Sequence, residues 1–221
     1  LEQALSKSQL RGTVGIGHTR WATHGRPSEV NAHPHVAGPI AVVHNGIIEN
    51  HLQLRAELEA GGIEMSSDTD TEIVSHLIHR EMKAGRELLA AIRGALAQVE
   101  GAYAIAVLCE TEPDRIIVAK SSSPLVLGVT EGASYCASDI PALLPYTNEM
   151  LFLEDGEVAV LEPTGFSIST LEGTPVRREP QTISWSPVMA EKAGFKHFML
   201  KEIFEQPRAL EDTLRGRLDR E

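Results

Sequence analysis

The order of the predicted elements constrains the fold of this 221-residue chain most strongly, because helices come first and a run of short strands follows. Apolar residues recur at helical spacing over residues 50–60, 69–84 and 87–99. Short turns such as Glu-Asp-Gly and Pro-Thr-Gly separate the strands, and such short connections join antiparallel neighbours. We therefore predict an α+β fold with antiparallel sheets, not a doubly wound parallel sheet. The strand-like segments cover residues 102–109, 115–120, 124–129, 133–137, 150–154, 157–162 and 166–171.

Other local signals concern the two ends of the chain and the start of one helix. Residues 12–20 form a strand-like run with glycines, which predicts a strand whose backbone approaches another group closely. Thr69 and Glu72 have the spacing of a capping box. The last segment, residues 196–220, is predicted to be a charged helix that breaks at Pro207.

Charge and cysteine content exclude several classes of protein. The net charge of −11 leaves no dense cationic face for a nucleic-acid backbone. Cys109 and Cys136 are the only cysteines in the sequence, so a disulfide framework is not expected. No apolar run approaches the length of a membrane span. We therefore expect a cytoplasmic protein that binds neither nucleic acid nor membrane.

Histidines concentrate near the start of the chain, where six of the nine lie between positions 18 and 51. Clustered imidazoles suggest a metal site, but carboxylates at ligand spacing are scarce in this region. Hydrogen-bonding roles are therefore favoured, and we expect no metal. The clustered residues are His18, His24, His33, His35, His44 and His51.

Polar residues at the ends of predicted elements offer two interpretations each. The Arg20 guanidinium could bind a carboxylate through two hydrogen bonds or form a surface ion pair. Asn45-Gly46 is typical of a tight turn ending a strand, but an amide and a glycine N–H could also form an oxyanion hole. Of Asp68 and Asp70, one is expected to cap a helix, and the other could bind an ammonium group.

Taken in order, four motifs resemble a known family. They are HTRWATHG (18–25), NAHPH (31–35), VHNGIIEN (43–50) and DTDTE (68–72). Together they closely resemble the glutaminase domain of the glucosamine-6-phosphate synthase family, also called glutamine–fructose-6-phosphate aminotransferases, over nearly the whole chain from about Gly12. The run KEIFEQP (201–207) resembles the entry to that family's sugar-phosphate isomerase domain.

The resemblance implies a fold of the N-terminal-nucleophile hydrolase type, with antiparallel sheets sandwiched between helices (αββα). It also implies hydrolysis of the L-glutamine amide, supplying ammonia for conversion of fructose 6-phosphate to glucosamine 6-phosphate. No cofactor is implied, and the complete protein is expected to be a homodimer. Two alternatives are another class II amidotransferase and a non-catalytic glutamine-binding module. The KEIFEQP run favours the aminosugar enzyme over another amidotransferase.

The resemblance also implies roles for individual residues. Asn45 and Gly46 would form the oxyanion hole that stabilises the attacked amide. Arg20 would bind the glutamine α-carboxylate, and Asp70 would bind the α-ammonium group. The residues that complete the glutamine site are Trp21, which closes it, and Thr23 and His24, which lie beside the carboxylate.

One departure from the family concerns the nucleophile, which is an N-terminal cysteine in the family, whereas Leu1 stands first here. We therefore expect a chain that lacks the first strands and the nucleophile and is inactive alone. The expected organisation is a glutaminase domain at 1–180, a linker at 181–195 and the start of the isomerase domain at 196–221.

Overall fold

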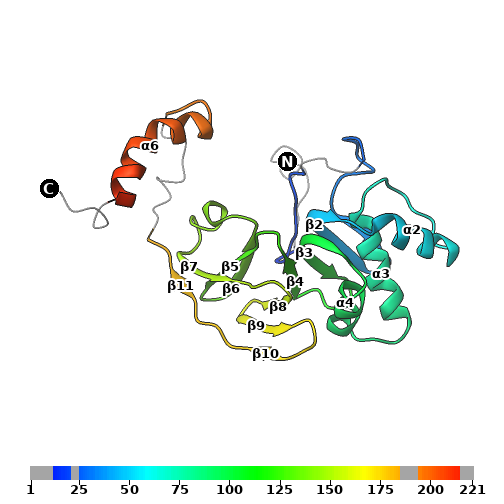
Figure 1. Ribbon diagram of the computed structural model, residues 1–221. Helices are drawn as coiled ribbons and strands as arrows, with labels where there is room; N and C mark the ends of the chain where they lie inside the picture. The colour runs from blue at the N-terminus through cyan, green and yellow to red at the C-terminus, as the bar shows by residue number, and fades with distance from the viewer. Residues whose placement is uncertain (1–11, 21–24, 185–193, 215–221) are drawn as a thin grey trace. The chain divides into compact units, whose positions relative to one another are not determined.

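The computed structural model describes residues 12–20, 25–184 and 194–214. The chain divides into two compact units, Leu1–Thr182 and Ile183–Glu221. The larger unit contains two sheets and a layer of helices (Figure 1). The smaller unit contains one described helix.

A seven-stranded antiparallel sheet forms the centre of the larger unit, with the strand order β1-β2-β3-β4-β8-β9-β10. Its longest ladder joins β2 and β3 from the pair Ile40–Cys109 to the pair Ile48–Gly101. This long register matters for the site, because it fixes the backbone on both sides of Asn45. The strands are β1 (His35–Ala37), β2 (Ile40–Ile48), β3 (Gly101–Cys109), β4 (Ile116–Ser121), β8 (Glu157–Glu162), β9 (Gly165–Thr170) and β10 (Pro175–Val176).

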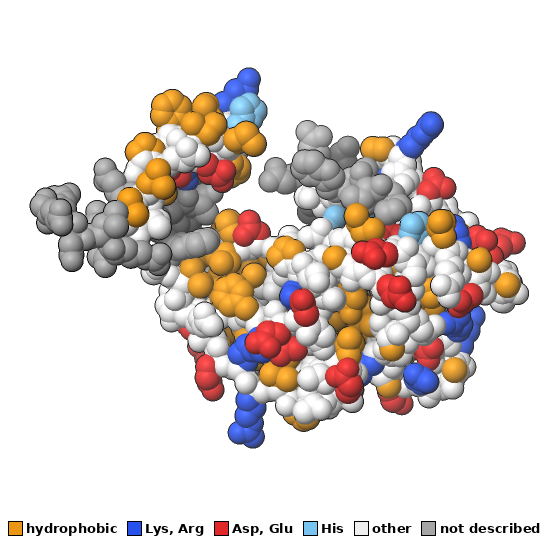
Figure 2. Space-filling view, in the orientation of Figure 1, with side chains coloured by type: hydrophobic (Ala, Val, Ile, Leu, Met, Phe, Trp, Pro, Cys, Tyr) orange, Lys and Arg blue, Asp and Glu red, His pale blue; other side chains and the backbone are white. Residues whose placement is uncertain are grey.

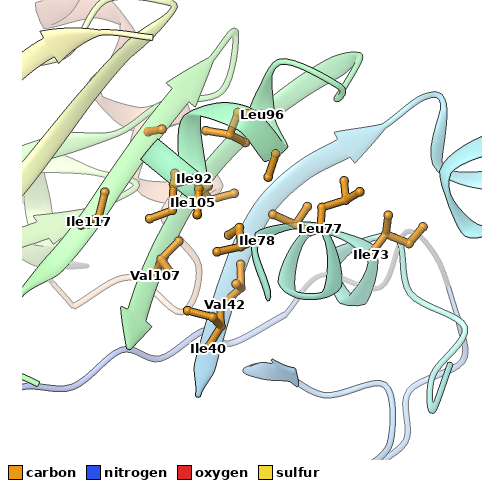
Figure 3. Packing of buried hydrophobic residues seen from close by; sticks show 14 of the residues in the cluster. Ile40, Val42, Ile73, Leu77, Ile78, Ile92, Leu96, Ile105, Val107 and Ile117 are labelled. Carbon is orange, nitrogen blue, oxygen red and sulfur yellow. The ribbon is translucent and has the colours of Figure 1, made fainter. Parts of the chain in front are cut away.

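Helices α2, α3 and α4 cover one face of this sheet (Figure 1). Successive strand residues point to opposite faces, so Ile40 and Val42 of β2 face the helices while Val43 faces away. Figure 3 shows these strand residues directed towards α3 and α4. Burying each such side chain stabilises the fold by about 1.5–3 kcal/mol. The helices are α2 (His51–Ala60), α3 (Thr71–Lys83) and α4 (Leu88–Leu96).

A four-stranded antiparallel sheet packs against the other face of the larger sheet, with the order β11-β7-β5-β6. Leu127 and Leu151 from this sheet meet Val43 and Val118 from the larger one. On the smaller sheet, the 3-10 helix η1 (Ile140–Ala142) leads into a segment that packs over Gly128. The strands are β11 (Gln181–Thr182), β7 (Glu149–Phe152), β5 (Val126–Thr130) and β6 (Ala133–Ala137).

The sequence predicted the helices and the main strands, but several local predictions were wrong. Residues 12–20 belong to no sheet. A Cβ added at Gly15 or Gly17 would meet no atom within 4 Å, so no close backbone approach explains these glycines. Asn45-Gly46 lies inside β2 and does not end it. The short strands β1, β10 and β11 were missed, because two or three residues carry no detectable periodicity.

The smaller unit contains α6 (Phe198–Leu214), which continues through Pro207 where the sequence predicted a break. Several large apolar side chains on α6 are exposed, including Met199 and Phe204. In Figure 2, orange apolar side chains gather on this helix, whereas red acidic and blue basic side chains are scattered over the visible face of the larger unit. Among the described residues, no helix is long and apolar enough to span a bilayer.

Candidate glutamine site

A cleft of about 270 Å³ opens where β2 passes the amino-terminal end of α3. It brings together four of the residues singled out from the sequence, Arg20, Asn45, Gly46 and Asp70. Trp21, Thr23 and His24 lie outside the described residues, so their predicted roles stay predictions. The cleft is lined by His18, Arg20, His33, His44, Asn45, Gly46, Ile47, Thr69, Asp70 and Thr71.

Asn45 and Gly46 are held in place by the ladder between β2 and β3, where Asn45 pairs with Ala104 and Gly46 with Tyr103. Gly46 has a φ of +143°, and a Cβ there would lie 2.0 Å from the carbonyl oxygen of Ala102. Only glycine fits this position without moving the backbone. The tight-turn interpretation is therefore wrong. The Asn45 side chain is exposed at the cleft, where an amide N–H can donate to a bound group.

Asp70 is buried at the N-cap position of α3, yet its side chain makes no capping hydrogen bond there. Instead, Oδ2 accepts a hydrogen bond of 2.9 Å from the backbone N–H of Ile48, and Nδ1 of His44 lies 4.0 Å away. Asp68 does not line the cleft, and its backbone N–H donates to Oδ1 of Asn31. Of the two aspartates, Asp70 is thus the one that places a carboxylate at the cleft.

Arg20 reaches the cleft from a backbone with a φ of +57°, in the left-handed region. Its guanidinium donates hydrogen bonds to the carbonyl oxygens of Gly25 at 3.0 Å and Arg26 at 3.2 Å. Its backbone N–H donates to Nδ1 of His18 at 2.9 Å. These bonds orient the guanidinium through the segment that begins at Gly25.

Three histidines of this region contact threonine hydroxyls. His33 and His44 both contact Oγ1 of Thr71, at 3.1 and 3.0 Å, and His35 contacts Oγ1 of Thr69 at 3.0 Å. Burial, followed by the nearby His18, His35, His44 and Arg20, lowers the pKa of His33 to about 3. Among the described residues, no group of three or more His, Cys, Asp and Glu side chains could hold a metal ion.

No site role was predicted from the sequence for Thr69, Thr71 or Glu72, which lie next to Asp70 in the chain. Only one of the two hydrogen bonds of the predicted capping box forms, the one from the Glu72 backbone N–H to Oγ1 of Thr69 at 3.4 Å. The Glu72 carboxylate does not return to Thr69 but accepts hydrogen bonds from Ser66 and Ser67. Alternating acidic residues and threonines in residues 68–72 were the available signal for this network.

Comparisons with known proteins agree with the resemblance found in the sequence. The family described as glutamine amidotransferase domain matches residues 18–145. The chain is 55% identical over 208 residues to glutamine–fructose-6-phosphate aminotransferase [isomerizing] of Symbiobacterium thermophilum, covering 93% of this chain and 34% of that protein. It is 50% identical over 223 residues to the enzyme of the same name from Aquifex aeolicus, covering 100% and 37%. The chain thus spans about a third of the length of these curated relatives.

Solved structures confirm the fold class. Glutamine phosphoribosylpyrophosphate (PRPP) amidotransferase from B. subtilis, complexed with ADP and GMP, aligns with a TM-score of 0.57 at 28% identity, over 70% of this chain and 34% of that one. A structure described as the allosteric regulatory enzyme of purine biosynthesis gives 0.58 at 28% identity, with the same two coverages. The predicted α+β fold of the N-terminal-nucleophile hydrolase type is confirmed. The chain belongs to the glutamine amidotransferase domain family.

Proposed function

We propose that the larger unit is the glutaminase domain of a glutamine–fructose-6-phosphate aminotransferase, in which ammonia released from glutamine converts fructose 6-phosphate to glucosamine 6-phosphate. The observation that carries this proposal is the meeting of Arg20, Asp70 and the Asn45-Gly46 pair in one cleft. Free glutamine has a carboxylate and an ammonium group at one end and an uncharged amide at the other. The cleft offers a complementary group for each of these three.

In this proposal the charged groups of the cleft bind the amino-acid end of the substrate. The Arg20 guanidinium donates to the α-carboxylate in the bidentate manner that its planar fork allows. The buried Asp70 carboxylate accepts from the α-ammonium group. Trp21, Thr23 and His24 complete this end, as the resemblance implies.

Asn45 and Gly46 act at the other end, where the amide carbon is attacked. Charge develops on the amide oxygen as the tetrahedral intermediate forms, and the Asn45 amide and Gly46 N–H stabilise it. Neither cysteine of the sequence suits the role of nucleophile. Cys109 is buried, and burial raises the pKa of Cys136 to about 11, so its thiol stays protonated near neutral pH. The nucleophile of the proposed reaction is the terminal cysteine that the resemblance implies.

The proposed organisation of the complete protein follows the resemblance. The glutaminase domain covers residues 1–180 and, because β11 pairs with β7, also the two residues of that strand that the sequence assigned to the linker. The rest of the predicted linker, up to residue 195, joins it to the next domain, and residues 196–221 begin the isomerase domain. The KEIFEQP run lies on α6, which supports this assignment. The fructose 6-phosphate site then belongs to the isomerase domain, and the complete protein is a cytoplasmic homodimer.

The proposal is tested on the full-length gene product with glutamine and fructose 6-phosphate as substrates. We expect equal amounts of glutamate and glucosamine 6-phosphate. In the Arg20→Lys variant, the KM for glutamine should rise at least tenfold, because the bidentate contact is lost. Synthesis from added ammonium salt should stay at the wild-type rate. Glutamate formation coupled to consumption of PRPP would instead identify another class II amidotransferase, and glutamine binding without glutamate formation would identify a binding module.

A further inference from the structure

The segment of residues 65–70, which carries Asp70 into the cleft, has no regular secondary structure but is bound by one buried carboxylate. Glu72 is 2% exposed. Its Oε1 accepts from the backbone N–H and the hydroxyl of Ser66, at 2.7 and 2.6 Å. Its Oε2 accepts from the same two groups of Ser67, at 2.7 and 2.6 Å. Both oxygens of this carboxylate are therefore used to shape the segment that ends at Asp70.

Two further side chains bind the same segment from other elements. Arg55 of α2 donates through Nη2 to the carbonyl oxygens of Ser67 at 2.9 Å and Thr69 at 3.3 Å. Asn31 accepts from the backbone N–H of Asp68 at 2.9 Å. The backbone from residue 66 to residue 69 is thus fixed on several sides, and Glu72 is more deeply buried than Arg55, the other charged side chain described here that contacts it.

The hydrogen bonds of this network have only one possible direction. A carboxylate only accepts, so the Ser67 hydroxyl proton points to Glu72. The Thr69 hydroxyl, 2.9 Å from the Ser67 oxygen, must then donate to it. Consequently His35, 3.0 Å from the Thr69 oxygen, donates through a protonated Nε2. The charge of Glu72 therefore orders a chain of polar groups that passes beside Asp70.

We propose that Glu72 is a positioning residue for the α-ammonium site, because it holds the segment that places the Asp70 carboxylate at the cleft. The inference rests on the proposed function, in which Asp70 receives the ammonium group of glutamine. Glu72 lies two residues after Asp70 and makes its four short hydrogen bonds on the protein side, so it acts through the segment and not on the substrate.

The charge state of Glu72 suits this role. Burial by itself raises the pKa of the carboxyl group, but hydrogen bonds from Ser66 and Ser67 outweigh burial and lower the pKa to about 2. Nε2 of His76 lies 3.6 Å from Oε1. Glu72 consequently stays ionised over the pH range of an assay, and it adds no ionisation of its own to the pH profile.

A structural role confined to the start of α3 is the competing explanation, since a carboxylate in the first turn also stabilises a helix. Such a role predicts lower stability with an unchanged KM. Glu157 provides a matched control, because it is another buried carboxylate, 5% exposed, that lies outside the cleft. It accepts from the backbone N–H of Glu154 at 2.7 Å and from Arg178 at 2.8 Å.

The experiment measures glutamine KM, kcat and melting temperature in the full-length enzyme for Glu72→Gln and Glu157→Gln. A glutamine side chain cannot accept all four hydrogen bonds, since its amide nitrogen only donates. We expect Glu72→Gln to raise the KM for glutamine on the order of 10- to 100-fold, with a much smaller change in kcat. Glu157→Gln should lower the melting temperature and leave the KM at the wild-type value.

Two further variants separate the outcomes. Ser67→Ala removes a single hydroxyl donor and should raise the KM by a smaller factor, so it replaces Glu72→Gln if that variant does not fold. Asp70→Asn is measured in parallel. A higher KM in Asp70→Asn, without one in Glu72→Gln or its replacement, overturns the positioning role alone. If none of these variants changes the KM, the assignment of the glutamine site itself is wrong.

Discussion

Lowering the pH from 7 to 5 is expected to destabilise the larger unit through His33. The pKa of this histidine falls to about 3 in the folded chain, from an ordinary value of 6.5. Burial is the largest cause of this lower pKa. Electrostatic repulsion from nearby groups follows, and these groups are His18, His35, His44 and Arg20. Nδ1 of His33 is buried and has no hydrogen-bond partner among the described residues. A proton on the ring would therefore have poor solvation and cationic neighbours.

The sign and size of the effect follow from proton linkage. Below pH 6.5 the unfolded chain binds a proton at His33 that the folded chain rejects, so stability falls as the pH falls towards 3. If the whole shift in the pKa of His33 contributes, the free energy of unfolding falls by about 2 kcal/mol between pH 7 and pH 5. Because the ring is only partly shielded from solvent, we expect about 1–2 kcal/mol. For a unit of this size, that loss lowers the melting temperature by about 2–8 °C.

The assay compares melting temperatures at pH 7 and pH 5 for the wild type and His33→Gln. Glutamine places a polar group near Nε2, which bonds Thr71 at 3.1 Å, but it does not titrate. The pH-induced drop should be smaller in the variant by the amount that His33 contributes. The drop does not vanish, because burial also lowers the pKa of His18 and His35.

A direct measurement completes this test. Titration of the His33 ring followed by NMR should show no protonation down to pH 5. An ordinary pKa near 6.5 for this ring, or an equal pH-induced drop in wild type and variant, would refute the reasoning.

Three other predictions concern the oxyanion pair and the core. In the full-length enzyme, Asn45→Ala should lower glutaminase kcat on the order of 10²–10³-fold with little change in KM or melting temperature, whereas a normal kcat would remove Asn45 from the oxyanion hole. Gly46→Ala should destabilise the larger unit by about 3 kcal/mol or more, seen by thermal denaturation, because the new Cβ meets the Ala102 carbonyl. Ile92→Ala removes a fully buried side chain and should cost about 2–5 kcal/mol in chemical denaturation, while a loss below 1 kcal/mol would contradict the packing of α4.

The elements that the sequence predicted well are those with a clear period. The apolar stripe of α3 is buried because one face of this helix packs on the sheet. The apolar run of β3 is buried on both faces, because helices cover one side of its sheet and the smaller sheet covers the other. Predictions based on local chemistry were less successful. Asn-Gly favours a turn by itself, but nine residue pairs with β3 keep Asn45 and Gly46 within a strand. Pro207 likewise does not interrupt α6.

The candidate site shows the same division. The position of Asp70 at a helix start was readable from its spacing, and the family motifs pointed to Arg20 and Asn45. The contacts of Glu72 could not be predicted from the sequence. The capping box predicts a bond to Thr69, three residues earlier, whereas the carboxylate binds Ser66 and Ser67. Such a choice depends on the path of an irregular segment, which no periodic pattern encodes.

The hydrogen bond between the Ile48 N–H and the Asp70 carboxylate constrains the distance between the two ends of the cleft. Ile48 lies two residues after Gly46 on β2. Asp70, the proposed partner of the substrate's ammonium group, is therefore hydrogen-bonded to the strand that carries Asn45 and Gly46. This hydrogen bond therefore limits how far the Asp70 carboxylate can move from the Gly46 N–H. In the proposed function, a substrate must match that span. Asparagine is one methylene shorter than glutamine, so its amide cannot reach the oxyanion pair while its ammonium group rests on Asp70.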